Sequence, residues 1–302
     1  MMQRKGIFLL FFMCFGIVSA EAQFWFLGQQ GKKPYYLAKF KAHSSMSFGA
    51  GSSNYIGDLA SFSGLASVAA QSMRWNAGFQ YTRHFSPHFS TAISLQYIRI
   101  AGDDNYFSPE GTYAGNYGRN LHFRTDIKEF GVQQVYEFVP NAQQLLKRSF
   151  ISPYVYVGLA GIMFDPMARG NYDYPTPGQK DWVSLDDQED ASYSKISFAI
   201  PFGFGLRYKV GPLTDIGFDI GYRVSMTDYL DDVSDSRNSR ASSKPLFNRS
   251  TETKAANTLV DRTKFTTTAA PSFLGGNDQY ITTQIRLIYH LPIIIGNPPL
   301  PK

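Results

Sequence analysis

The chain has 302 residues, of which 43% are hydrophobic, a composition that excludes global disorder and allows one large domain or two small ones. Only 18% of the residues are charged while 16% are aromatic, a balance that favours a wide apolar exterior over the surface of an ordinary soluble enzyme. The formal net charge of +5 is scattered without a block of Lys and Arg, which argues against nucleic acid as a partner.

Residues 1–22 have the pattern of a secretory signal peptide. Arg4 and Lys5 form its basic start, residues 6–18 its apolar core, and 20–22 an Ala-Glu-Ala cleavage site. This apolar core is too short to span about 30 Å of hydrocarbon as a helix. The one cysteine of the sequence, Cys14, lies within it, so we expect an exported mature chain without disulfides or cysteine-ligated metal. Residues 23–42 are then a periplasmic N-terminal lead-in.

Strict alternation of apolar and polar residues predicts the strands. From 194 to 210 the even positions carry mostly large apolar residues, and the odd positions are rich in Gly, Ser, Ala, Lys and Arg. The same pattern recurs at 73–82, 215–226 and 281–291, and softer patterns predict strands at 43–52, 89–100, 121–139 and 152–164. The segment 121–139 changes phase near Glu129 and Phe130, which indicates a bulge or a passage from water into a membrane.

Long and short connections alternate between these strands. The long ones cover about 53–71, 101–119, 165–193 and 229–277, and the short ones lie near 86–87, 140–150 and 211–212. This layout is typical of outer-membrane barrels. We therefore expect an all-β fold, an eight-stranded antiparallel transmembrane β-barrel of the OmpX/OmpA-like outer-membrane type over 43–291, with four long extracellular loops and a periplasmic tail at 292–302.

The main alternative is a soluble, lipocalin-like barrel, which also has eight antiparallel strands. Such a barrel would direct the large apolar residues inward and leave Gly, Asp, Arg and Lys outside. Here the polar face is rich in small residues that fit a narrow lumen, while the apolar face is large and lipid-like. The pattern therefore favours the membrane barrel, located in the outer membrane with lipid around it.

The predicted lumen carries charges of both signs. Its predicted members are Arg74, Glu129, Lys195, Arg207, Asp215, Asp219, Arg223 and Arg286, with Glu137 as a further candidate. These residues could form a charged pore or proton path, or an interior network of salt bridges that plugs the barrel. Eight strands leave room for little beyond side chains, and buried charges need partners, so the residues favour the plug.

No residue pattern indicates catalysis or metal binding. The acidic clusters do not match the spacing of an EF-hand loop. The five histidines, His43, His84, His88, His122 and His290, are spread over different strands, and we expect them to be solvated or interfacial. The sequence contains no GxSxG motif, and the outward stripes of the clear strands offer no Ser/His/Asp set. We therefore expect no catalytic residue, no metal, no cofactor, no small-molecule substrate and no enzymatic activity.

Several motifs together resemble the PorG-type, DUF6089-like family of outer-membrane barrels from Bacteroidetes, which is associated with the type IX secretion system. The matching stretches are residues 48–51 (FGAG), 54–59 (NYIGDL), 119–129 (RNLHFRTDIKE), Pro153-Tyr154 with Gly158 and 164–166 (FDP), 200–205 (IPFGFG) and 227–234 (TDYLDDVS). They run in family order over nearly the whole mature chain, and the last is the most specific. The long polar loop before the final strand and the proline-rich tail depart from the family pattern.

The resemblance implies a non-enzymatic integral outer-membrane component of type IX protein secretion that anchors or contacts a periplasmic lipoprotein ring and its partner. The motif residues would lock loops onto the barrel rim: Asn54, Tyr55, Gly57, Asp58, Arg119, Asn120, Arg124, Thr227, Asp228, Tyr229, Leu230, Asp231 and Asp232. Two alternatives remain open. One is a general OmpX-like surface or structural barrel that binds extracellular partners, and the other is a small solute pore.

Overall fold

The computed structural model describes residues 40, 42–57, 66–108, 110–111, 114–119, 122–140, 148–169, 182–184, 193–231 and 277–291. The chain divides into two compact units, Met1–Lys39 and Phe40–Lys302, and every described residue belongs to the second. The expected signal peptide, nearly all of the lead-in and the tail at 292–302 therefore lie outside the described residues.

Strands dominate the described part of the chain, as the two-residue period of the sequence predicts. They are β1 (His43–Ile56), β2 (Arg74–His84), β3 (Phe89–Asp103), β4 (His122–Glu137), β5 (Ile151–Arg169), β6 (Trp182–Ser184), β7 (Ile196–Lys209), β8 (Thr214–Ser225) and β9 (Gln279–Leu291). Three short helical elements accompany them: α3 (Ala66–Ser72), the 3-10 turn η1 (Asp104–Tyr106) and α4 (Ala114–Arg119). Within the described residues, no helix is both long enough and apolar enough to cross a bilayer.

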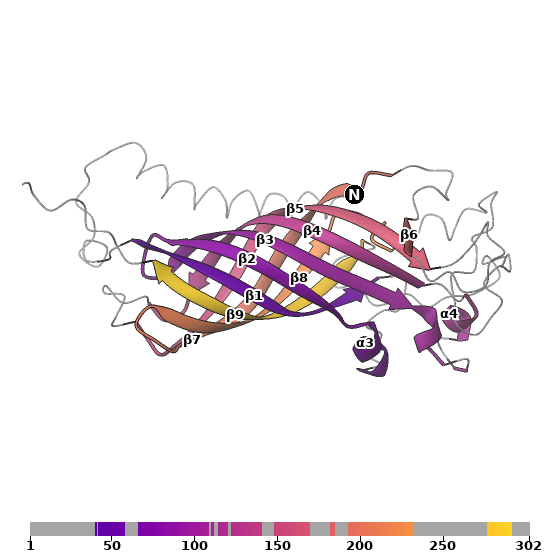
Figure 1. Cartoon of the computed structure of the whole chain (residues 1–302), viewed down its shortest axis with the longest axis horizontal. Coiled ribbons are helices and arrows are strands. Elements are labelled where there is room, and N and C mark those ends of the chain that lie inside the picture. The colour runs from indigo at the N-terminus through magenta and orange to yellow at the C-terminus, as the bar shows by residue number, and fades with distance from the viewer. Residues whose placement is uncertain are drawn as a thin grey trace, which may run out of the picture. The chain divides into compact units, whose positions relative to one another are not determined.

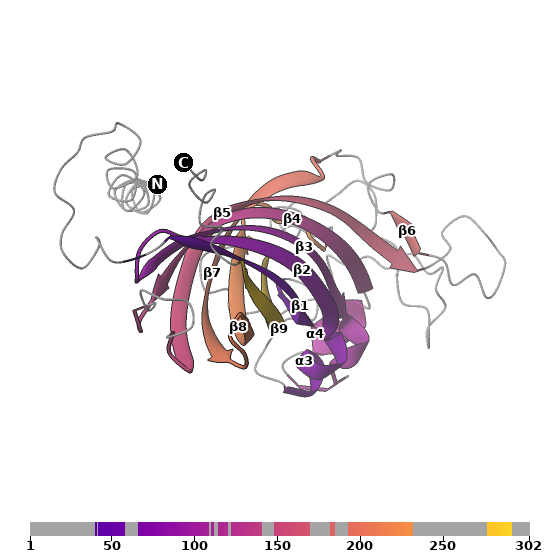
Figure 2. The same ribbon diagram turned by 60° about the vertical axis from the view of Figure 1, so that its left-hand side comes forward.

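Eight of the nine described strands close into one antiparallel barrel (Figures 1 and 2). Neighbours in the sequence pair with each other, β1 joins β9, and each barrel strand has a partner on both edges. The predicted eight-stranded antiparallel barrel is confirmed. The ninth strand, β6, lies in a segment that the sequence predicts to be a loop. Its three residues pair with the end of β5, outside the ring.

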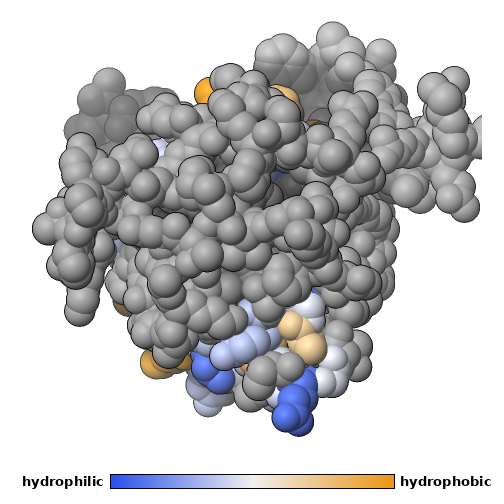
Figure 3. Space-filling view, turned by 90° about the vertical axis from the view of Figure 1, so that its right-hand side faces the viewer, coloured by the Kyte–Doolittle hydropathy of each residue, from blue (hydrophilic) through white to orange (hydrophobic). Residues whose placement is uncertain are grey.

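The connections define two ends of the barrel. Short connections join β2 to β3, β4 to β5 and β7 to β8, and β1 begins and β9 ends beside them; this is the short-turn end. The long connections leave the opposite, long-loop end, where α3 and α4 lie (Figure 1). Figure 3 looks onto that end, and the described residues visible at its lower edge mix strongly hydrophilic with apolar side chains.

The outer face of the barrel is apolar. Large side chains on three different strands are among the most exposed: Phe48 at 61%, Phe198 at 62% and Ile285 at 65%. Leaving a side chain of this size in water instead of an apolar medium costs roughly 1.5–3 kcal/mol. A contiguous apolar surface of this extent is the surface of a barrel that faces lipid.

Aromatic side chains flank this apolar face at both ends. Towards the long-loop end, Trp75 stacks on Tyr97 with ring centroids 5.2 Å apart. At the short-turn end, Phe89 packs against Tyr136, with centroids 5.2 Å apart. Tyr97 and Phe89 lie on the same strand, and their separation is about 26 Å along it, or roughly 20 Å along the barrel axis at a tilt near 40°. This spacing is close to the height of the apolar band of outer-membrane barrels, which is about 25 Å.

Strand β4 runs without a bulge. Its register with β3 and with β5 is continuous through Glu129 and Phe130, and its odd-numbered residues face inward from end to end. The bulge that the phase change suggested is therefore ruled out. The phase change lies in the type of residue, while the backbone keeps its alternation. Near the long-loop end the inward residues become apolar, as at Ile127, and the outward ones become polar, as at Asp126 and Lys128. This is the pattern of a strand that continues past the apolar band.

The inner face combines bulky rings with glycine. Tyr154 on β5 points into the lumen, and a Cβ added to Gly205 on β7 would collide with its ring and with the carboxylate of Asp219. Glycine therefore makes room for the ring inside a narrow barrel. On the outer face of β5, a Cβ added to Gly161 would have no neighbouring atom within 4 Å.

The two glycines give a matched test of this packing. We expect Gly205→Ala to lower the free energy of unfolding by about 1–3 kcal/mol through overpacking, and Gly161→Ala to change it by less than about 0.5 kcal/mol. Urea unfolding of the refolded barrel in detergent, read from the migration difference between unboiled and boiled protein, measures both. Equal effects of the two substitutions would contradict the proposed packing of the lumen.

Candidate functional site

The lumen is the candidate site because the buried charges of the barrel gather there. Four buried arginines each pair with a carboxylate of their own: Arg148 with Asp215, Arg207 with Glu137, Arg223 with Glu129, and Arg286 with Asp219. The pairs lie at successive depths between the long-loop end and the short-turn end. Each satisfies the requirement that a buried charge has a partner.

The pair nearest the long-loop end crosses the lumen. Arg223 of β8 lies 3.4 Å from Glu129 of β4, two strands that are not neighbours in the barrel. Tyr280 donates a hydrogen bond of 3.0 Å to the same carboxylate, and Arg223 also donates to Gln96 on β3 and to Thr282 on β9. Arg223 is 1% exposed and Glu129 2%. Side chains from both sides of the barrel therefore meet on its axis.

The next pair joins two neighbouring strands, and amide side chains extend it to β2. Arg286 of β9 lies 2.5 Å from Asp219 of β8. Its guanidinium also donates to the side-chain oxygens of Gln80 at 2.6 Å and Gln284 at 2.7 Å. The hydroxyl of Tyr154, on β5, donates to Asp219 across the intervening strand β7. Charge-assisted bonds of this kind are the stronger ones in proteins.

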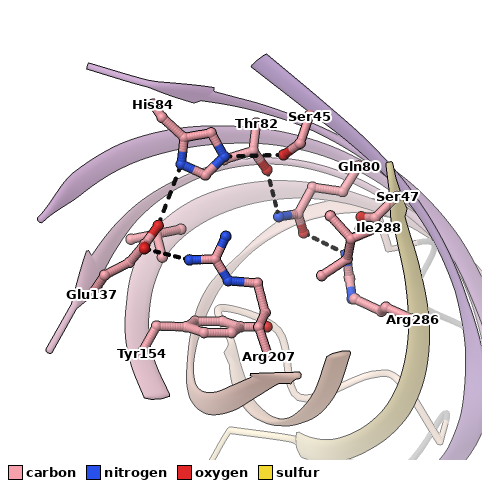
Figure 4. Close-up of a pocket in the computed structure, with 11 residues that line it drawn as sticks. Ser45, Ser47, Gln80, Thr82, His84, Glu137, Tyr154, Arg207, Arg286 and Ile288 are labelled. Atoms are coloured by element: carbon pink, nitrogen blue, oxygen red, sulfur yellow. Dashed lines mark hydrogen bonds and ion pairs between the residues drawn. The ribbon is translucent and has the colours of Figure 1, made fainter. Parts of the chain in front are cut away.

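Glu137 is the centre of the third group, near the short-turn end. Arg207 pairs with one of its oxygens, and His84 Nδ1 lies 3.3 Å from the other (Figure 4). Ser90 Oγ shares a hydrogen bond of 2.7 Å with His84 Nδ1, and Ser45 Oγ one of 3.1 Å with His84 Nε2. Each ring nitrogen of His84 therefore has a polar neighbour.

Asp215 is the centre of the fourth group. Its carboxylate accepts hydrogen bonds from Arg148 Nε at 3.0 and 3.2 Å and lies 2.7 Å from His290 Nε2. Arg148 also donates to the backbone oxygens of Pro212 and Gly211, at 2.6 and 2.9 Å. One buried arginine thus ties the turn between β7 and β8 to the lumen.

A small cavity separates the groups around Asp219 and Glu137. Its volume is about 30 Å³, enough for about one water molecule. Ser45, His84, Glu137 and Arg207 are among its lining residues (Figure 4). Ser45, His84 and Glu137 share the connectivity of a hydrolase triad, but the cavity beside them has no room for an ester or peptide substrate.

Three histidines meet at the short-turn end, although the sequence predicts dispersed side chains that are solvated or interfacial. His43 and His84 are direct register partners of β1 and β2, and His290 on β9 lies opposite Ser45, two residues further along β1. All three rings are buried, and the rings of His43 and His84 stack with centroids 4.5 Å apart. The expectation failed because β1 pairs with both β2 and β9, which only closure of the barrel reveals.

The TDYLDD stretch reaches into the mouth of the barrel at the long-loop end. The backbone nitrogen of Leu230 donates to Asp278 Oδ2 at 2.7 Å, and its carbonyl accepts from Thr125 Oγ1 at 2.5 Å. Tyr55 donates to the same Asp278 carboxylate. Leu230 is fully buried in an apolar cluster that includes Ile98. A loop segment therefore closes the lumen above the ion pairs.

Other motif residues also hold loops against the rim. Asn54 Nδ2 donates to the carbonyl of Ala69 in α3 at 2.7 Å, and Tyr229 stacks on Tyr193 with centroids 4.7 Å apart. A Cβ added to Gly57 would collide with the Tyr55 hydroxyl and with Asp278, so only glycine fits there.

The remaining motif residues have less specific surroundings. The guanidinium of Arg124 lies on the outer face, 4.3 Å from the centroid of the Trp182 ring. The Thr227 carbonyl accepts a hydrogen bond from Ser225 Oγ, Asp228 is partly buried and Asp231 is buried. Arg119 ends α4. Asp58, Asn120 and Asp232 lie outside the described residues.

Two of the eight predicted lumen residues lie elsewhere. Arg74 is in the inward phase of β2, but it starts the strand, and its guanidinium donates to the carbonyls of Gln71 and Met73 at the long-loop end. Lys195 precedes β7 and pairs with the outward Asp165 at 2.6 Å, where both side chains are about one-third exposed. Both lie near strand ends, where alternation no longer determines direction. The other six are buried in the lumen, and Arg148 joins them from a turn.

A sequence family described as "Domain of unknown function (DUF6089)" matches residues 38–251. The chain belongs to this family. The match begins just before β1 and ends in the connection after β8, so β9 lies beyond it although β9 closes the barrel. Among curated proteins, none matches the chain.

Solved outer-membrane barrels are similar at a distance. Ail, the attachment invasion locus protein of Yersinia pestis, in complex with a heparin analogue, is 12% identical over 83% of this chain and 100% of its own, with a TM-score of 0.36. OprG of Pseudomonas aeruginosa is 11% identical over 84% and 98%, with a TM-score of 0.38. These likenesses are too distant to bear on function.

Removing one member of a crossing ion pair tests its importance. We expect Glu129→Ala to lower the free energy of unfolding by about 3–5 kcal/mol, because Arg223 would remain buried without its carboxylate. Lys195→Ala, which breaks a partly exposed pair, should cost about 0–1 kcal/mol. Urea unfolding in detergent measures both. A Glu129→Ala variant as stable as Lys195→Ala would contradict the importance of the crossing pair.

Proposed function

We propose that this protein is a non-enzymatic integral outer-membrane component of the type IX protein secretion system. In this proposal an N-terminal signal peptide directs export, the short-turn end faces the periplasm and the long loops face the exterior. The barrel then anchors or contacts a periplasmic lipoprotein ring. The apolar outer face with its aromatic flanks supports residence in a membrane, and the alternation of short and long connections supports this orientation.

The observation that carries an anchoring role is the filled lumen. Arg223 and Glu129 join non-neighbouring strands on the barrel axis, and the loop segment around Leu230 lies above them. The cavity further down holds about one water molecule. A barrel filled in this way supports a role as an anchor over a role as a solute pore.

The secretion assignment rests on the motifs. The chain belongs to the DUF6089 family, and the motif residues that resemble PorG-type barrels hold loops at the rim, above all around Leu230 and Asp278. The polar groups of the lumen bind one another, which supports a structural role without catalysis. The alternative of a general OmpX-like barrel shares the same fold and differs only in its partners.

Deletion of the gene tests the secretion role. We expect proteins that carry type IX secretion signals to accumulate in the periplasm of the deletion strain, and the wild-type gene to restore their release to the medium and cell surface. Quantitative mass spectrometry of the three fractions measures this distribution. An unchanged distribution in a strain without a paralogous gene would contradict the proposal and favour the OmpX-like alternative.

Photo-crosslinking from one site at each end of the barrel shows which end contacts the partner. A crosslinking side chain at Ser86, in the short turn between β2 and β3, should capture periplasmic proteins of the secretion machine. The matched site is the exposed Glu110, on the long connection between β3 and β4, which should capture none of them. Capture from Glu110 alone would contradict the proposed orientation.

A further inference from the structure

Three buried imidazoles converge at the short-turn end of the lumen. His43, His84 and His290 come from β1, β2 and β9, and each can offer a nitrogen such that all three atoms lie within 4.8 Å of one another. Their exposures are 4%, 1% and 0%. Histidine is the commonest metal ligand of proteins, and buried groups of three are the usual protein contribution to sites with an open fourth position.

Carboxylates hold two of these rings in the manner of metal-binding histidines. His290 Nε2 lies 2.7 Å from Asp215, while its Nδ1 is buried and has no hydrogen-bond partner among the described residues. His84 Nδ1 lies 3.3 Å from Glu137, while its Nε2 lies 3.1 Å from the hydroxyl of Ser45. In metal sites a carboxylate commonly binds one ring nitrogen and so directs the other towards the ion.

We propose that His43, His84 and His290 bind one divalent transition-metal ion of the Zn²⁺ class. Neutral imidazoles suit Zn²⁺, Cu²⁺ and Ni²⁺, whereas Mg²⁺ and Ca²⁺ require oxygen ligands. The fourth position falls to the Ser45 hydroxyl or to a water in the adjoining cavity of about 30 Å³, which Ser45 and His84 both line. This site is independent of the secretion role.

The rings need a small adjustment to bind the ion. Ligand nitrogens of a tetrahedral zinc site, at bonds of 2.0–2.1 Å, lie about 3.4 Å apart. The three nitrogens must therefore approach by about 1.4 Å from their limit of 4.8 Å. His43 is the first residue of β1 and His290 the last but one of β9, so both lie at the open ends of their strands.

The surrounding charges permit a cation. Arg207 and Arg148 are the nearest buried positive groups, and each is already paired with a carboxylate, Glu137 and Asp215 respectively. These four groups carry no net charge together. The ion would thus enter surroundings without net charge, in which Glu137 contacts the ring of His84 and Asp215 contacts the ring of His290.

Titration of the mature protein, refolded in detergent without an affinity tag and stripped of metal with EDTA, tests the site. We expect isothermal titration calorimetry to show one Zn²⁺ per barrel, and Co²⁺ to give the visible spectrum of a tetrahedral nitrogen site. His43→Gln and His290→Gln should each weaken Zn²⁺ binding at least tenfold. His122→Gln changes an equally buried histidine at the long-loop end and should leave binding unchanged.

The fold of every variant is checked by its heat-dependent migration on a gel, so that loss of binding is not confused with loss of the barrel. At the same Zn²⁺ concentration, the unfolding temperature should rise in the wild type and in His122→Gln, and rise less in His290→Gln. Absence of stoichiometric binding to the folded wild type would overturn the proposal. Equal affinity of the folded wild type and the folded His290→Gln variant would overturn it as well.

Discussion

The ion pair between Arg223 and Glu129 spans the inside of the barrel, and the rest of the fold is arranged so that such charges can be buried. An apolar outer face leaves the polar residues of every strand to point inward, where only other side chains can solvate them. Closure of the sheet by β4 and β5 brings partners together from strands that are not neighbours, as it does for Arg223 and Glu129. Inward glycines such as Gly205 supply the space that the rings and guanidiniums occupy.

Both ends of the barrel are joined to this interior. At the short-turn end, Arg148 binds a turn and a lumen carboxylate with the same guanidinium. At the long-loop end, Leu230 and Asp278 fix the start and the end of the longest connection against Tyr55. A barrel whose connections are bonded into its core is stiff at both ends, which agrees with the proposed anchoring role.

Alternation in the sequence is sufficient to predict the eight barrel strands, their antiparallel closure and the burial of residues in the middle of strands, such as Asp219 and Glu129. It was insufficient at the strand ends, where Arg74 and Lys195 turn away from the lumen. The histidine cluster could not be predicted either, because it depends on the register of β1 with both β2 and β9. A closed barrel joins residues nearly 250 positions apart, and periodicity along one strand does not contain that information.

Electrical recording from the purified wild-type barrel in planar lipid bilayers tests the filled lumen most directly. Because paired side chains meet on the axis and the cavity beside Glu137 holds about one water molecule, the inserted barrel should show no steady conductance. Stable open channels of uniform size from the inserted wild-type protein would show a continuous aqueous path and contradict the closed lumen on which the proposed anchoring role rests.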